Sequence, residues 1–128
     1  MANKDLFLKK GFREVQASGV FTLLVKQLKK APEPKFKDCE NQLSRYEGLS
    51  IVYSNQCPWV ARFMSELGEL IEKKGLKIDV VELKTPEQAQ DAPSIYAVFN
   101  LVNDGTLLVD HYISNTRFLN ILNKELKQ

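Results

Sequence analysis

The 128-residue sequence lacks the features that mark membrane and nucleic-acid-binding proteins. No apolar run approaches the roughly 20 residues that a helix needs to span a bilayer, and the first residues lack the apolar stretch of a signal peptide. Its 18 basic and 16 acidic residues are interspersed and give a net charge of +2. This balance gives no electrostatic basis for attraction to nucleic acid or to an anionic membrane, so we expect neither as a partner.

Cysteine and histidine are also scarce. The two cysteines, Cys39 and Cys57, stand in unlike settings, and nothing suggests a disulfide framework. A reducing cytoplasm is therefore the expected location. Cys39 has no partner at metal-ligand spacing and is expected to be inert. No pair of carboxylates and no set of His, Cys and Asp residues has the spacing of a metal site, so we expect no metal.

The strongest pattern in the sequence lies between residues 49 and 75. Residues 51–53 are β-branched and aromatic, which indicates a short buried strand. Pro58 suits the first position of a helix, and Gly75 ends the apolar periodicity that follows it. We therefore predict a helix over residues 58–74. Its apolar stripe consists of Val60, Phe63, Met64, Leu67, Leu70 and Ile71.

Cys57 comes directly before this predicted helix. Strand, short loop, cysteine, proline and helix is the order found in thioredoxin and glutaredoxin active sites. A sulfur at a helix N-terminus meets unpaired N–H groups and the positive end of the macrodipole, which favour a thiolate. Dithiol chemistry needs a second cysteine three residues later, however, and that position is Val60.

The remainder of the chain predicts a strand over 77–83, a short helix that Thr85 caps, a hairpin and a final helix over 114–126 capped by Ser114. In the hairpin, Asp104-Gly105 is typical of a two-residue type I′ turn between strands 96–102 and 106–113. Counting outward from that turn pairs Val98 with His111.

These elements follow the order βαβ, short helix, ββα, which predicts an α/β, thioredoxin-like fold. We expect a four-stranded mixed sheet in the spatial order 2-1-3-4, with helices 58–74 and 114–126 on one face. In that fold a proline, usually in cis, precedes the third strand and lies against the active-site loop. Pro93 has this place in the sequence.

The first 30 residues predict an appendage that consists of a helix and a β-hairpin. A helix over residues 3–10 would end at Gly11, and strands 12–15 and 20–25 would flank a turn at 17–19. So few residues cannot bury a core of their own. The polar segment 29–35, with two prolines, is typical of a linker, and a short helix is expected over 38–46. We predict an appendage over 1–30 and a domain over 31–128.

Three separated motifs resemble one known family. They are the segments 53–58 (YSNQCP), 89–100 (AQDAPS with Tyr96 and Val98-Phe99-Asn100) and 111–118 (HYISNTRF). Together they resemble the YoaP-like domain, a thioredoxin-like module attached behind GNAT-type acetyltransferase domains, over about residues 33–127. Segments 6–12 and 20–26 also look like the last helix and hairpin of a GNAT domain.

This resemblance implies that the chain is the C-terminal portion of a GNAT-family N-acetyltransferase. The glycine-rich loop with which such enzymes bind acetyl-CoA is missing, so the chain should not acetylate anything alone. We expect no cofactor in this chain and acetyl-CoA only in a complete enzyme. The expected partners are the acetyltransferase domain or a second copy, through the hairpin 12–28, with a small-molecule or peptide ligand for the module.

Two functional classes follow for the module. As a non-catalytic binding domain, it would use a groove beside Cys57 and Pro93 to recognise a substrate or partner. As a monothiol oxidoreductase, it would use Cys57 as the catalytic residue, with Arg62 and Lys84 as the basic groups for glutathione. The binding module is the preferred hypothesis. Its candidate binding residues are Ser54, Gln56, Cys57, Pro58, Trp59, Pro93, Ser94, Tyr96 and His111.

Two of these residues have specific expected settings. Trp59 should lie at the mouth of the site, either as a ligand-facing surface or as a lid on the core. His111, the only histidine, should be hydrogen-bonded and half-buried on an apolar strand face beside Leu107, Val109 and Ile113.

Overall fold

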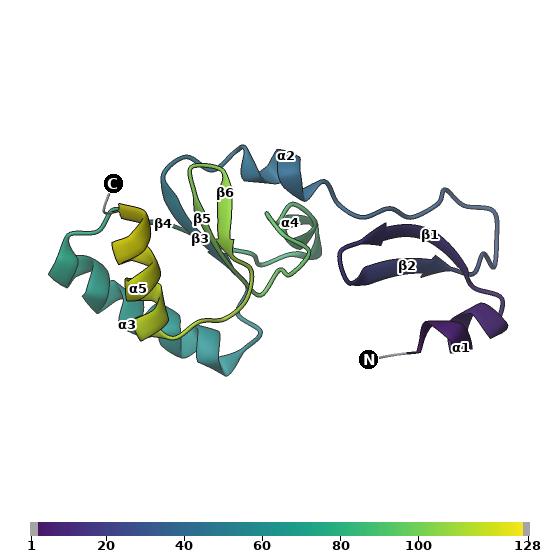
Figure 1. Ribbon diagram of the computed structural model, residues 1–128, viewed down its shortest axis with the longest axis horizontal. Coiled ribbons are helices and arrows are strands. Elements are labelled where there is room, and N and C mark those ends of the chain that lie inside the picture. Colours follow the sequence, from purple (N-terminus) through teal and green to yellow (C-terminus); the bar gives the residue numbers. More distant parts are fainter. Residues whose placement is uncertain (1–2, 127–128) are drawn as a thin grey trace. The chain divides into compact units, whose positions relative to one another are not determined.

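The computed structural model describes residues 3–126 and divides the chain into two compact units, one ending at Lys37 and the other beginning at Asp38 (Figure 1). Within the described residues, every helix is too short or too polar to cross a membrane.

The second unit is a mixed α/β structure built on a four-stranded sheet. The strands β3 (Leu49–Tyr53), β4 (Asp79–Glu82), β5 (Phe99–Asn103) and β6 (Thr106–Val109) lie in the order β4-β3-β5-β6. Strand β3 runs parallel to β4 and antiparallel to β5, and β5 runs antiparallel to β6. The spatial order predicted from the sequence is confirmed. Parallel neighbours need a long connection, which here contains a helix.

Helices α3 (Pro58–Lys74) and α5 (Asn115–Leu126) lie on one face of this sheet, as predicted (Figure 1). Helix α3 begins at Pro58 and ends at Gly75, whose φ of 60° suits a residue without a side chain. The two helices and the inner residues of the strands form one hydrophobic core. Its buried members are Leu49, Ile51, Val60, Phe63, Leu67, Phe99, Leu101, Val109, Ile113, Phe118 and Leu122.

Phe63 stands at the centre of this core. Its ring centroid lies 5.2 Å from that of Phe99 in β5 and 5.5 Å from that of Phe118 in α5. Both contacts are edge-to-face, which is the favoured geometry for aromatic pairs. A single side chain of α3 therefore joins the sheet to the second helix.

The opposite face of the sheet is buried at the two central strands, β3 and β5. Val52, Asn100 and Val102 are fully buried there, and Figure 1 shows the short helices α2 (Cys39–Leu43) and α4 (Pro86–Gln90) on this side. The α2 helix is shorter than the predicted 38–46. The α4 helix has the predicted capping box: the Thr85 side chain accepts from the Gln88 N–H, and the Gln88 side chain accepts from the Thr85 N–H.

The β5–β6 hairpin confirms the predicted turn but not the predicted pairing beyond it. Asp104 and Gly105 both have positive φ, 46° and 76°, as a type I′ turn requires. Asn103 pairs with Thr106, but an irregularity after the Val102–Leu107 pair brings Leu101 opposite Val109. The predicted pairing of Val98 with His111 and the strand to residue 113 are therefore wrong. Such a bulge shifts the register and bends the strand, and β6 ends at Val109.

The start of β5 also differs from the prediction. The strand begins at Phe99 rather than at residue 96, because the preceding loop is held by side-chain hydrogen bonds that are described below. No peptide bond in the described residues is cis, so Pro93 departs from the cis proline that a thioredoxin-like fold usually has at this place. The Pro93 side chain is fully buried, and its contribution here is packing.

The first unit contains α1 (Lys4–Lys9), β1 (Arg13–Ser18) and β2 (Phe21–Val25), with β1 and β2 antiparallel. Helix α1 is capped by Asn3 and followed by Gly11 at φ 90°, as expected. Strand β1 is longer than the predicted 12–15, whereas β2 nearly matches the predicted 20–25, and Gly19 at φ 58° lies in the turn between them, as predicted. Among residues 3–37 no side chain is buried. The exposed large apolar residues are Leu6, Phe7, Leu8, Val20 and Leu28.

Replacement of Phe63 by alanine should lower the free energy of unfolding by about 3–5 kcal/mol, because it leaves a cavity where three elements meet. Urea denaturation of the whole chain measures this loss. The matched control is Trp59→Ala on the same helix, where 59% of the side chain is exposed; its effect should stay within about 1 kcal/mol. Equal losses for the two variants would refute the assignment of Phe63 as the central core residue.

Candidate functional site

Cys57 is the last residue before α3 and has the extended backbone of an N-cap residue (φ −127°, ψ 125°). Its thiol makes no capping hydrogen bond. Instead the side chain is partly buried and packs against the hydrophobic core. The position at the helix start is therefore as predicted, while the sulfur contacts apolar side chains rather than the free N–H groups of the first turn.

The residues around Cys57 differ sharply in exposure. Gln56, Pro58 and Trp59 are exposed, and Trp59 is a surface residue rather than a lid on the core. Ser54 is buried, and its Oγ has no hydrogen-bond partner in the part of the chain that the structure describes. The Ser54 N–H donates to the carbonyl oxygen of Val98 at 3.0 Å, which fixes this loop to the segment before β5.

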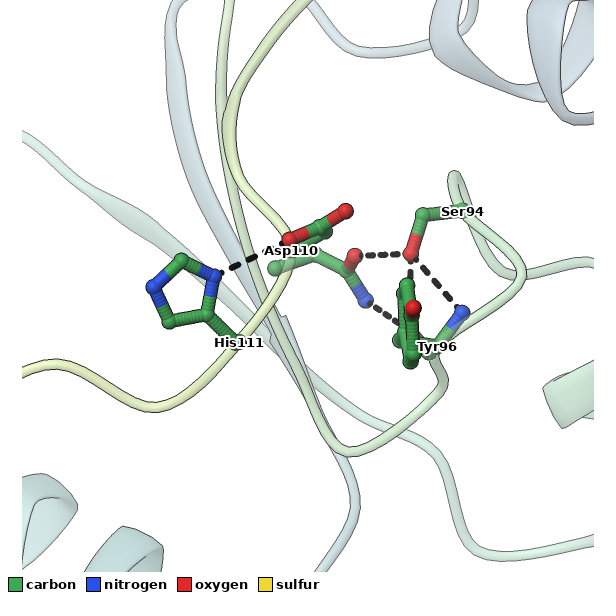
Figure 2. A network of polar contacts seen from close by, with 5 residues as sticks. Ser94, Tyr96, Asp110 and His111 are labelled. Carbon is green, nitrogen blue, oxygen red and sulfur yellow. Dashed lines mark hydrogen bonds and ion pairs between the residues drawn. The ribbon is translucent and has the colours of Figure 1, made fainter. Parts of the chain in front are cut away.

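Ser94 and Tyr96 belong to a polar network at the start of β5 (Figure 2). The Ser94 hydroxyl accepts from the Tyr96 N–H at 3.1 Å and contacts the Tyr96 carbonyl oxygen at 2.8 Å. It also contacts Oδ1 of Asn100, whose Nδ2 donates to the Tyr96 carbonyl at 2.9 Å. Asn100 is fully buried. Its amide is therefore satisfied inside the core by the Tyr96 carbonyl and the Ser94 hydroxyl, and these contacts hold the loop before β5.

The sequence interpretation includes Asn100 in a family motif but not among the candidate site residues. The signal that marks it is an amide within an otherwise apolar strand, between Phe99 and Leu101. Such a residue is tolerated inside a core only when its hydrogen bonds are satisfied. The network fixes the loop before β5, so the strand begins at Phe99 rather than at residue 96.

His111 lies outside the sheet, in the loop after β6. Its side chain is 59% exposed, and Nδ1 is 3.0 Å from Oδ1 of Asp110 (Figure 2). The expectation of a half-buried histidine on an apolar face is wrong, because β6 ends two residues earlier. In the described part of the chain, neither a hydrogen bond nor an ion pair joins His111 to Cys57.

The two basic residues considered for a glutathione site each face a carboxylate. Arg62 Nε is 3.0 Å from Glu66 Oε1, and Lys84 Nζ is 3.8 Å from Glu82 Oε2. Glu82 also contributes to the setting of Tyr53: burial first, and the Glu82 charge second, raise the pKa of Tyr53 above its ordinary value. Residues 3–126 contain no cluster of His, Cys, Asp and Glu that could hold a metal ion.

Comparison with known proteins finds one distant relative. The chain is 32% identical over 94 residues to the uncharacterized N-acetyltransferase YoaP of Bacillus subtilis (strain 168). The similar region covers 73% of this chain but 38% of the relative, so the chain spans well under half of the relative's length. No family model matches the chain, and no solved structure does. The chain is thus related to part of a protein that is named as an acetyltransferase.

The polar network predicts a specific consequence of removing its amide. Asn100→Ala should lower the free energy of unfolding by about 1–3 kcal/mol, because it removes the hydrogen bonds of a buried amide with Ser94 and Tyr96. Hydrogen exchange at the amide of Tyr96 should also become faster. Asn120→Ala, at an exposed position of α5, is the control and should cost no stability. Unchanged stability in Asn100→Ala would show that the network does not hold the loop.

Proposed function

We propose that this chain is the C-terminal portion of a GNAT-family N-acetyltransferase, and that its second unit is a thioredoxin-like, non-catalytic module that binds a substrate or partner. The observation that carries the proposal is the similarity to the Bacillus relative, of which the chain matches one part. The sequence motifs of the YoaP-like domain point the same way. Acetyl-CoA would then bind in the portion of the enzyme that this chain does not include.

The sheet supports a thioredoxin-like assignment. Strand β3, helix α3 and parallel strand β4 are followed by the antiparallel pair β5–β6 and helix α5, with both long helices on one face. Cys57 and Pro58 stand where that fold has its active-site cysteine and proline. The trans peptide at Pro93 is the departure from this pattern.

The setting of Cys57 supports a binding role over a catalytic one. Its thiol is partly buried against core side chains, and no hydrogen bond joins it to His111 within the described residues. Arg62 and Lys84 each lie beside a carboxylate, and the negative charges of Glu66 and Glu82 offset the positive charge that would attract an anionic tripeptide. The monothiol route remains the alternative, because Cys57 does stand at the start of a 17-residue helix.

The first unit supports a place within a larger protein. It buries no side chain among residues 3–37, while a unit of this size needs a core, cross-links or a partner to be stable. Val20 and Leu28 are 80% and 88% exposed. We propose that the acetyltransferase domain covers this hairpin in the complete enzyme, and that a second copy covers it when the chain is alone.

The chain alone should therefore dimerise through its first unit. Light scattering should give a dimer mass for the whole chain and a monomer mass after removal of residues 1–30. The truncated form retains the whole second unit, which has its own core. An unchanged dimer after this deletion would contradict the proposed role of the hairpin.

Cys57→Ser separates the two functional classes. Serine has nearly the same size and can cap the helix but is a poor nucleophile, so folding should be preserved. Turnover of a glutathione mixed disulfide should be negligible for both the native chain and the variant. The corresponding substitution in a full-length relative should leave acetyl transfer largely intact. Clear turnover by the native chain that is lost in Cys57→Ser would establish the redox function instead.

A further inference from the structure

A pocket of about 160 Å³ lies between the first half of α3 and the loop that leads into α5. It is small enough to suit one functional group of a ligand rather than a large cofactor. The α3 side contributes an aromatic and charged stripe at helical spacing, and the other side contributes Tyr112 and the two residues at the start of α5. The full lining is Trp59, Arg62, Phe63, Glu66, Tyr112, Ser114 and Asn115.

Glu66 organises the polar groups of this pocket. Its Oε1 accepts from Arg62 Nε at 3.0 Å, and its Oε2 accepts from Nδ2 of Asn115. This contact fixes the orientation of the Asn115 amide, because the opposite orientation would set two oxygens against each other. The result is that Oδ1 of Asn115 is buried with no donor among the described residues. A buried acceptor without a donor is costly, so the pocket favours a ligand that brings an N–H group.

The walls of the pocket favour a positive charge on that ligand. Trp59 and Tyr112 are 59% and 39% exposed. The faces of such rings attract organic cations, and indole does so most strongly. The Glu66 carboxylate supplies a negative charge at the same place. Its present partner Arg62 has a side chain that is 71% exposed, and exposed ion pairs of this kind contribute little, so Arg62 can be displaced at small cost.

We propose that this pocket binds the primary ammonium group of an amine. The ammonium would take the place of the Arg62 guanidinium on Glu66, donate to Oδ1 of Asn115 after a small rotation of that side chain, and lie against the Trp59 ring. The inference rests on the proposed function in one respect. A nitrogen atom accepts the acetyl group in N-acetyl transfer, so the module would bind the kind of substrate that the complete enzyme acetylates. Its test uses binding alone, without acetyl transfer.

Trp59 is the only tryptophan of the chain and reports directly on the pocket. Its fluorescence should change saturably with propylammonium but not with propanol or propionate, and the NMR signals of the Asn115 side-chain amide should shift in parallel. Glu66→Gln should weaken propylammonium binding about tenfold, because it removes a charge-assisted contact. The control Glu72→Gln, exposed on the same helix, should leave binding unchanged.

Arg62→Gln is the most informative variant, because the proposal predicts tighter ligand binding, which a partly unfolded variant could not show. Removal of the competing guanidinium should tighten propylammonium binding. Saturable binding of propionate that Arg62→Gln abolishes would overturn the proposal in favour of an anion site. Absence of saturable propylammonium binding, or equal binding by Glu66→Gln, would also overturn it. Nα-acetyl-lysine methylamide distinguishes two sources of the bound ammonium group. If it binds more tightly than propylammonium, the ligand is a lysine of a peptide; if it binds more weakly, the ligand is a free small amine.

Discussion

The aromatic contacts of Phe63 are the interaction on which the second unit depends. The ring lies edge-on to Phe99 of the sheet and to Phe118 of the last helix, so one residue of α3 fixes how the three elements pack. The same helix carries Cys57 at its start and the pocket residues Trp59, Arg62 and Glu66 on its outer side. The position of every candidate site residue on α3 therefore follows from how Phe63 is buried.

The two units are stabilised by different kinds of interaction. The second has a continuous core, and its central strands β3 and β5 are buried on both faces. The first relies on strand pairing, a ring contact between Phe7 and Phe12, and ion pairs such as that of Lys4 with Glu14. Exposed ion pairs contribute little, and two strands alone are marginal in water. This contrast is the physical reason to place the first unit in a larger assembly.

The sequence predicted the elements whose signals are local. Pro58 and Gly75 bound α3, Thr85 and Gln88 cap α4, and Asp104-Gly105 makes the turn. The sequence pattern mispredicted strand ends that side-chain hydrogen bonds or an irregular pairing determine. Asn100 of β5 bonds to Ser94 in the preceding loop, and the irregularity in the β5–β6 pairing leaves His111 in a loop. The pocket on α3 could not be predicted, because its second side comes from residues nearly 50 positions later in the chain, as the contact between Glu66 and Asn115 shows.

Amide hydrogen exchange on the chain tests whether the first unit is stable without a partner, because it reports the stability of each unit separately. At concentrations low enough to keep the chain monomeric, we expect strong protection in β3, β5 and α3 and almost none in β1 and β2. Addition of an acetyltransferase domain from a full-length relative should then protect β1 and β2. Comparable protection of both units in the isolated monomer would show that the first unit is stable without a partner.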